Sequence, residues 1–202
     1  MNKLELAWKE PFYIFHDEHF TELMEIFKEG VGDVKGHFGF GRPHYQFLDL
    51  NFSVYEDDAL NDLTKEELEA HYEQMIEESG NEFYGEVVRG EFSTHISFEV
   101  GNDDYLHLIS IKLLEKGKGV GTRMVAWLEE YAKSQGFKGV LIRSTESEVM
   151  NHLAVKRGYV PVYNTVEERI AFGKQQGFRY DPNAVIKYDS KGHIFGYYQL
   201  TF

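Results

Sequence analysis

Residues 104–121 read Asp-Tyr-Leu-His-Leu-Ile-Ser-Ile-Lys-Leu-Leu-Glu-Lys-Gly-Lys-Gly-Val-Gly, and this stretch decides the fold that we expect. Its first part, about 104–114, is rich in large apolar residues and predicts a strand. Its last part carries glycine at 117, 119 and 121 and leads into a segment, 119–135, with helical periodicity. A glycine-rich turn between a strand and a helix directs the free N–H groups of the first helical turn at one point, where they bind phosphate.

The glycine loop therefore predicts a phosphate site, most simply one for a pyrophosphate. Lys116, Lys118 and Arg123 add positive charge around it in a chain that is otherwise acidic. The loop lacks the Gly-Lys-Ser/Thr ending of a nucleoside-triphosphate loop and the spacing of a dinucleotide fingerprint. These differences argue against nucleotide-driven energy transfer and hydride transfer. A glycine-rich turn that binds no ligand is the alternative.

The strand before the loop has an irregular apolar pattern. Leu106 and Leu108 share one parity, whereas Ile109, Ile111 and Leu113 share the other. A β-bulge shifts the parity in this way. A strand buried on both faces also explains the pattern, because parity then carries no information.

Working outward, the chain predicts one α/β domain over 1–202, with a mixed sheet. An antiparallel meander is expected over 82–89, 92–100 and 104–114, followed by the helix at 119–135, a buried strand at 140–142 and a helix at 146–157. A strand, a helix and another strand of this length suggest parallel strands with a crossover helix. We expect the core in 82–163, substrate-side helices and a loop in 1–81, and a C-terminal hairpin in 164–202.

The two ends of the chain complete this prediction. The N-terminal part predicts helices at 17–29 and 65–79, a strand within 45–55, and a glycine-rich loop from Gly30 to Pro43 that is either a substrate lid or a connector. Thr64 and Glu67 form the pattern of a capping box. The C-terminal part predicts an extended segment at 159–163, a helix at about 165–175, and a hairpin whose turn is Asp189-Ser190-Lys191-Gly192.

Composition excludes several classes of protein. The chain has 202 residues, of which 42% are hydrophobic and 15% aromatic, so it is not intrinsically disordered. Its net charge of −13 argues against general nucleic-acid binding. There is no Cys, which excludes disulfides, thiolate zinc sites and a Cys nucleophile, and we predict no metal site. We see no secretory signal and no apolar run of about 18 residues, so we expect a cytoplasmic protein without a membrane partner.

Lys116-Gly117-Lys118-Gly119-Val120-Gly121 resembles the signature of the GNAT N-acetyltransferases, in which Arg or Gln precedes x-x-Gly-x-Gly/Ala. The resemblance extends over 82–163 and implies that backbone amides of the loop hold the pyrophosphate of acetyl-CoA. It also implies that two parallel strands splay at the bulge to admit the pantetheine arm, and that the Ile111 amide polarises the thioester carbonyl. The cofactor-binding residues that it implies are Ile111, Leu113, Lys116, Gly117, Lys118, Gly119, Val120, Gly121, Thr122, Ser147 and Asn151.

The sequence departs from the family pattern at three places. Lys116 keeps the charge but not the planar fork of the family's Arg. The Asn that the family carries near the start of the next helix falls on Ser147 by one count and on Asn151 by another. The family's Tyr, which protonates the leaving thiolate, falls on Ala154, so water or the nearby Tyr159 is left as the acid.

A general base must also be found, because the amine loses a proton as it attacks the thioester. His107 is the best placed titratable residue, and its unperturbed pKa of about 6.5 suits a base. The alternative is a histidine packed in the sheet with satisfied hydrogen bonds. Glu99 and His95, on the adjacent strand, are fallbacks that would act through water.

We therefore expect an N-acetyltransferase that transfers acetyl from acetyl-CoA to a primary amine by direct attack. The absence of Cys excludes a Cys-linked acetyl-enzyme. The alternative is a protein on the same fold that binds acyl-CoA or a partner without catalysis. The acidic surface favours a small-molecule or lysine-bearing amine as acceptor, and it argues against an acceptor carried on tRNA. The sequence leaves a homodimer through the C-terminal hairpin open.

Overall fold

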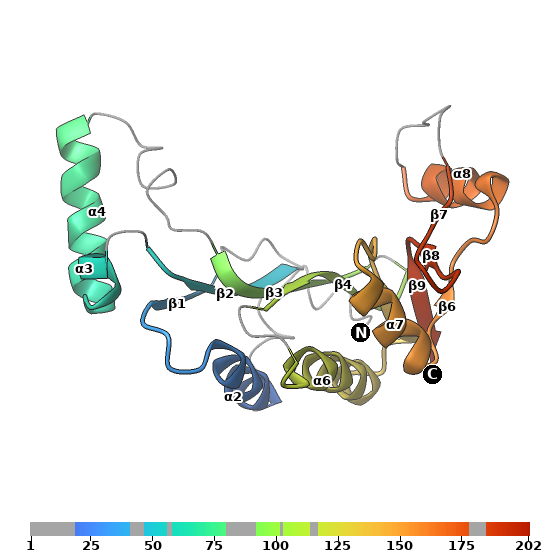
Figure 1. The fold of residues 1–202 in the computed structure, drawn as a ribbon, viewed down its shortest axis with the longest axis horizontal. Coiled ribbons are helices and arrows are strands. Elements are labelled where there is room, and N and C mark those ends of the chain that lie inside the picture. The colour runs from blue at the N-terminus through green and yellow to red at the C-terminus, as the bar shows by residue number, and fades with distance from the viewer. Residues whose placement is uncertain are drawn as a thin grey trace. The chain divides into compact units, whose positions relative to one another are not determined.

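The computed structural model describes residues 19–40, 47–55, 58–79, 92–101, 103–113, 117–177 and 185–202. They fall into two compact units, which we describe separately. Unit 1 holds Phe98–Ile109 and Val125–Phe202, and unit 2 holds the described residues up to Ser97 together with Ser110–Met124. Strands β3 (Phe92–Val100) and β4 (Tyr105–Lys112) and helix α6 (Val120–Ser134), which are labelled in Figure 1, each contribute residues to both units.

The described residues of unit 2 include helices α2 and α4 and strands of the sheet, in the order β1-β2-β3-β4. Its elements before β3 are α2 (His19–Val31), β1 (His37–Phe40), β2 (Phe47–Ser53), α3 (Asp58–Asn61) and α4 (Lys65–Ser79). Strand β1 pairs antiparallel with β2, from His37 opposite Ser53 to Phe40 opposite Leu50. The predicted strand at 82–89 lies outside the described residues.

The glycine-rich segment after α2 corrects one prediction. We expected a loop from Gly30 to Pro43, but residues 37–40 form strand β1, and α2 continues past Gly30 to Val31. Gly30 is buried, and an added Cβ would lie 2.9 Å from Val120 Cγ1. The glycine therefore permits close packing of α2 on the start of α6 instead of ending the helix.

The capping box at the start of α4 is confirmed. The Glu67 amide donates to Thr64 Oγ1 at 3.2 Å, and the Thr64 amide donates to Glu67 Oε2 at 2.8 Å. Just before this cap, Leu63 packs against a small core cluster made of Tyr55, Leu60 and Leu68. Capping and packing together fix the direction in which the chain enters the helix.

Unit 1 holds the C-terminal part of the sheet in the order β3-β4-β5-β9-β6, with a separate β7–β8 pair (Figure 1). The elements after α6 are β5 (Gly139–Ile142), α7 (Glu148–Lys156), β6 (Val160–Pro161), α8 (Val166–Gln175), β7 (Lys187–Tyr188), β8 (Ile194–Phe195) and β9 (Tyr198–Thr201). Strands β4 and β5 are parallel and are joined through α6, whereas β9 runs antiparallel to both β5 and β6. The expected α/β class with a mixed, mostly antiparallel sheet is confirmed.

Burial along β4 explains its irregular sequence pattern. Leu106, His107 and Leu108 are all buried, so this part of the strand is covered on both faces and the alternation carries no information there. The pairing of β4 with β5 runs from Tyr105 opposite Gly139 to Leu108 opposite Ile142, while β4 itself continues to Lys112. The β-bulge and the single-domain organisation stay predictions.

Candidate functional site

The glycine loop before α6 has the backbone that the sequence predicts for a phosphate site. Gly117 and Gly119 have φ angles of +85° and +73°, which side-chain-bearing residues rarely adopt. Apart from the adjoining residues of the chain, no described heavy atom lies within 4 Å of the Cβ position of either glycine. The loop therefore presents bare backbone at these two positions. Lys116, the first residue of the predicted signature, lies outside the described residues.

Helix α6 begins directly after this loop. The amide of Arg123 donates the first helical hydrogen bond, to the Gly119 carbonyl at 3.1 Å, so the amides of Val120, Gly121 and Thr122 precede the hydrogen-bonded ladder. The first turn carries no acidic residue that would compete for these amides. The positive end of the helix dipole and these amides make the position suitable for an anion.

The basic residues around the loop differ in what they contact. Arg123 Nη2 donates to Glu29 Oε2 at 2.7 Å, and this hydrogen bond raises the pKa of Arg123 and lowers that of Glu29. Lys118 and Lys112 are exposed. Part of the local positive charge that the sequence suggested is thus paired with α2, and the binding of an anion by the loop stays a prediction.

Ile111 is the next-to-last residue of β4 and Leu113 directly follows the strand, and both are half-buried. Leu108 is the last β4 residue that pairs with β5, and Ile111 comes later in the same strand. An added Cβ on Gly121 would lie 3.2 Å from Leu113 Cδ1, so the start of α6 packs closely on this segment. The predicted roles of Ile111 and Leu113 toward pantetheine stay predictions.

His107, the predicted base, is held between two carboxylates in unit 1. Its Nε2 lies 2.9 Å from Asp103 Oδ1, and its Nδ1 lies 3.7 Å from Glu99 Oε1. Glu99 also accepts from Arg143 Nη2 at 2.7 Å. Burial alone would lower the pKa of His107, but the two carboxylates outweigh it and the pKa is raised. Nδ1 of this buried ring has no hydrogen-bond partner among the described residues, so the packed alternative with satisfied hydrogen bonds is met only at Nε2, and the catalytic role of His107 stays a prediction.

Tyr159, the predicted acid, is buried in unit 1 with 3% of its surface exposed. Burial raises the pKa of its hydroxyl, and the nearby Glu129 carboxylate raises it further. Glu129 is itself buried and accepts from Arg157 Nε at 2.7 Å. Ala154, where the family's Tyr falls by one count, is fully buried. A tyrosine in this setting releases its proton reluctantly, so the geometry gives little support to an acid role.

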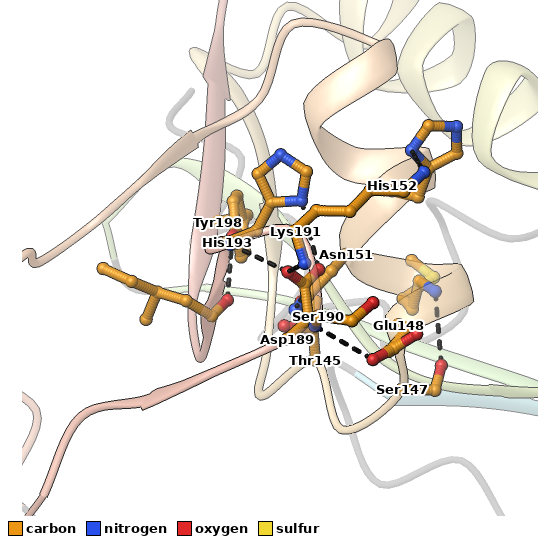
Figure 2. Close-up of polar contacts among 12 residues, drawn as sticks. Thr145, Ser147, Glu148, Asn151, His152, Asp189, Ser190, Lys191, His193 and Tyr198 are labelled. Atoms are coloured by element: carbon orange, nitrogen blue, oxygen red, sulfur yellow. Dashed lines mark hydrogen bonds and ion pairs between the residues drawn. The ribbon is translucent and has the colours of Figure 1, made fainter.

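Ser147 and Asn151, the two candidates for the family's Asn, have different positions on α7 (Figure 2). Ser147 is exposed and caps the helix by accepting a hydrogen bond from the Met150 amide at 3.2 Å. Asn151 is fully buried, and its Nδ2 donates to Asp189 Oδ2 at 3.4 Å. Of the two, only Ser147 has the exposure that a ligand contact requires, while Asn151 contacts the C-terminal hairpin.

The turn that follows β7 contains a pair of residues that sequence reasoning missed. His193 Nδ1 lies 3.1 Å from Asp189 Oδ2 in the turn between β7 and β8 (Figure 2). The sequence identified the turn but treated it only as a hairpin connection. The signal that was available is the Asp189-Ser190-Lys191-Gly192-His193 order, in which a tight turn returns the histidine to the carboxylate.

Metal-binding clusters and membrane-spanning helices were sought among the same described residues. Within the described ranges, no group of three or more His, Cys, Asp or Glu side chains is arranged to hold a metal ion. No helix in the same ranges is long and apolar enough to cross a membrane.

Comparison with known proteins matches one family, and two of the similar solved structures are acetyltransferases. The profile of the "Acetyltransferase (GNAT) family" matches residues 45–159. A candidate streptothricin acetyltransferase from Bacillus anthracis str. Ames, solved in complex with acetyl coenzyme A, is 17% identical with a TM-score of 0.37, over 56% of this chain and 58% of that chain. Nourseothricin acetyltransferase is 16% identical with a TM-score of 0.36, over 55% and 59%. Each match thus spans less than two thirds of the solved chain, and no curated protein matches.

Proposed function

Since the chain belongs to the acetyltransferase (GNAT) family, we propose that it transfers the acetyl group of acetyl-CoA to a primary amine. The observation that carries the proposal is the glycine loop. Gly117 and Gly119 leave bare backbone at the start of a 15-residue helix whose first turn lacks acids. This arrangement fits a pyrophosphate, which would accept hydrogen bonds from the amides of Lys118 to Thr122.

The chemistry is direct attack of the amine on the bound thioester. Acetyl-CoA supplies the thioester, and the chain supplies the anion cradle and, we propose, the Ile111 amide as hydrogen-bond donor to the developing oxyanion. A thiol has an ordinary pKa of about 8.5, so its thiolate leaves readily near neutral pH. A dedicated acid is therefore dispensable, which agrees with the burial of Tyr159.

The proposed pyrophosphate site in the glycine loop is tested by adding a single methyl group to the loop. Gly119→Ala puts a Cβ where the pyrophosphate would approach the backbone, and we expect acetyl-CoA binding to weaken about 10-fold, or about 1.4 kcal/mol, by isothermal titration calorimetry. Gly158→Ala is the matched control, because Gly158 also has a positive φ, +87°, and open space around its Cβ position but lies outside the cradle. Equal binding by the two variants, or no binding by the wild type, would contradict the proposal.

A protein that binds acyl-CoA without catalysis is the second candidate. It is favoured by the state of His107 and Tyr159, whose pKa values are both shifted in the direction that hinders proton transfer in their proposed roles. Thiol release from acetyl-CoA with a panel of primary amines separates the two candidates. Tight binding of acetyl-CoA with no acylated amine would leave the binding protein as the function.

We further propose a cationic acceptor, either a small amine or a lysine-bearing one. Primary amines are protonated at neutral pH, and the net charge of −13 attracts cations while it repels nucleic acids. Exposed acids on α4, among them Glu66 and Glu67, contribute to this field. A cytoplasmic location and a homodimer through the C-terminal hairpin stay predictions of the same kind.

A further inference from the structure

Unit 2 contains a serine and a histidine in direct contact on neighbouring strands. Nε2 of His95, on β3, lies 2.5 Å from Oγ of Ser110, on β4. Both residues are half-buried, so the pair is partly open to solvent. A hydroxyl within hydrogen-bonding distance of an imidazole can pass a proton from a bound molecule to the ring.

The partner of the imidazole decides whether a proton can pass through the contact. A hydroxyl both donates and accepts, so Ser110 Oγ can give its proton to His95 Nε2 while it takes one from a bound molecule. His37, in the same unit, differs, because its Nε2 lies 2.6 Å from the Leu60 carbonyl oxygen. A carbonyl oxygen only accepts, so that contact keeps a proton on the His37 ring. Of these two histidines, His95 is the one that can receive a proton from its partner.

Ser110 lies directly beside the residue to which we assign the oxyanion contact. It precedes Ile111 in the chain, so its side chain starts on the carbon next to the peptide bond that carries the Ile111 amide. Ile111 packs on the first turn of α6, because a Cβ added to Gly121 would lie 3.9 Å from Ile111 Cδ1. Successive residues of a strand point to opposite faces, so Ser110 Oγ is on the face opposite to α6. An amine that reaches the Ile111 amide from that face meets the Ser110 hydroxyl.

All parts of this arrangement lie in unit 2. That unit holds β3 up to Ser97, and it holds Ser110–Met124, which includes the end of β4, the glycine loop and the first turn of α6. The glycine loop and the contact between His95 and Ser110 are therefore placed by the same compact body. No residue of unit 1 is needed to bring them together.

We propose that Ser110 and His95 form a proton relay for the acceptor amine. The inference rests on the proposed acetyl transfer. The amine nitrogen forms a bond to the thioester carbonyl carbon, its proton moves to Ser110 Oγ, and the hydroxyl proton of Ser110 moves to His95 Nε2. The C–S bond breaks, the departing thiolate takes a proton from water, and His95 then releases its extra proton to solvent. Ser110 is the catalytic residue because it contacts the amine, and His95 is a positioning residue because it acts through Ser110.

Removal of the hydroxyl tests the relay. Thiol release from acetyl-CoA is measured with a panel of primary amines for the wild type and for Ser110→Ala. We expect kcat to fall about 100-fold in Ser110→Ala, the size of effect that a general base has, with unchanged affinity for acetyl-CoA by isothermal titration calorimetry. A kcat within about threefold of the wild type would overturn the relay.

Two further variants separate the relay from a general effect on the sheet. Ser110→Thr keeps a hydroxyl at the same position, so it should retain most of the activity. Ser53→Ala is the matched control, because it removes a buried hydroxyl from β2 and leaves the contact between His95 and Ser110 in place. A loss of kcat in Ser53→Ala as large as that in Ser110→Ala would assign the effect to the sheet and overturn the relay.

The two residues of the relay must also act as one unit. His95→Gln removes the imidazole, and we expect kcat to fall about as far as in Ser110→Ala. The double variant should be no slower than either single variant by more than about threefold, because the effects of residues that act together do not multiply. Losses that multiply in the double variant would show two independent roles and overturn the relay.

A last measurement does not depend on turnover. The relay requires that neutral His95 carry no proton on Nε2, because that nitrogen receives the proton of Ser110. Nitrogen-15 NMR of the imidazoles reports which ring nitrogen is protonated. An unprotonated Nε2 whose resonance moves in Ser110→Ala supports the relay, whereas a proton on Nε2 in the wild type overturns it.

These experiments distinguish failure of the relay from failure of the proposed function. Absence of acetyl-CoA binding by the wild type would overturn the proposed function, and the NMR result would still decide the direction of the hydrogen bond between Ser110 and His95. Binding of acetyl-CoA without acylation of any amine would overturn both the transfer and the relay. Normal turnover by Ser110→Ala would overturn the relay alone.

Discussion

Gly101 shows how one residue makes room for a buried charged group. An added Cβ would lie 2.2 Å from His107 Nε2 and 2.3 Å from Asp103 Oδ1. The Gly101 amide also donates to the Tyr105 carbonyl at 2.9 Å, which closes the turn between β3 and β4. The glycine is therefore required by the side chain packed against it.

Gly101→Ala is expected to destabilise the fold by about 1–3 kcal/mol, because His107 is buried and has no space to move. Urea unfolding measures the change. In a His107→Ala background the same substitution should cost much less, since the clashing ring is gone. Equal costs in the two backgrounds would show that the clash is not the cause.

The residues of the site differ in how far the sequence could predict them. Gly117 and Gly119 were predicted as an anion cradle from their place between a strand and a helix start; the structure gives both a positive φ angle, and the ligand stays a prediction. His193 was missed because its partner, Asp189, has an obvious local role as a turn residue. Only the folded turn shows that the carboxylate faces the imidazole.

At the scale of elements, an ion pair joins α6 to the end of α7. Arg157, the C-cap residue of α7, donates from Nε and Nη2 to the two oxygens of Glu129 on α6. Glu129 is 5% exposed, so its charge is stabilised mainly by the two hydrogen bonds from the Arg157 guanidinium. The ion pair therefore holds together α6, which precedes β5 in the sequence, and α7, which follows it.

Arg157→Leu should destabilise unit 1 by roughly 3–5 kcal/mol, because it leaves the Glu129 carboxylate buried without its partner. The double variant Glu129→Leu with Arg157→Leu should recover most of that loss, since no charge then remains buried. Urea unfolding of the two variants gives the comparison. A double variant as unstable as the single one would show that packing, and not the unpaired charge, is responsible.

The elements predicted best are those whose signals are local. Helix α6 forms within the segment 119–135 that the periodicity predicted, and the Thr64–Glu67 cap at the start of α4 forms as expected. Strand β1 was missed because Gly36, Gly39 and Gly41 suggest a loop, whereas the strand forms by pairing with β2, whose partner residues 50–53 lie outside that segment. Tertiary pairing overrides local propensity there, and no pattern within 30–43 reveals it.

At the scale of the whole molecule, the chain carries a net charge of −13, and its carboxylates differ in how the fold holds them. Several carboxylates are held by donors in the fold, and burial and hydrogen bonds shift their pKa values. For Glu99, the neighbouring His107 ring is the main cause of a lowered pKa; for Asp103, donors including His107 outweigh the opposing effect of burial. The stability of the folded chain must therefore depend on pH through the same three residues.

The histidine and the two carboxylates lower the unfolding free energy on opposite sides of the pH at which stability is greatest. His107 has a raised pKa, so its contribution is fully present below its unfolded value of 6.5 and is lost as the pH rises through the folded value. Asp103 and Glu99 have lowered pKa values, so their contributions are present above the unfolded values of 3.8 and 4.5 and are lost as the pH falls.

We therefore expect the unfolding free energy to be greatest in mildly acidic solution and to decline as the pH rises past 6.5. His107→Gln keeps a polar side chain in the strand but removes the titration, so its stability should be lower at pH 6 and flatter between pH 6 and 9. Urea unfolding across this range gives both curves. If the stability of His107→Gln declined with pH as steeply as that of the wild type, the His107 imidazolium would not be the cause of the decline. The decline would then come from repulsion among the excess acids, which grows with pH in both proteins.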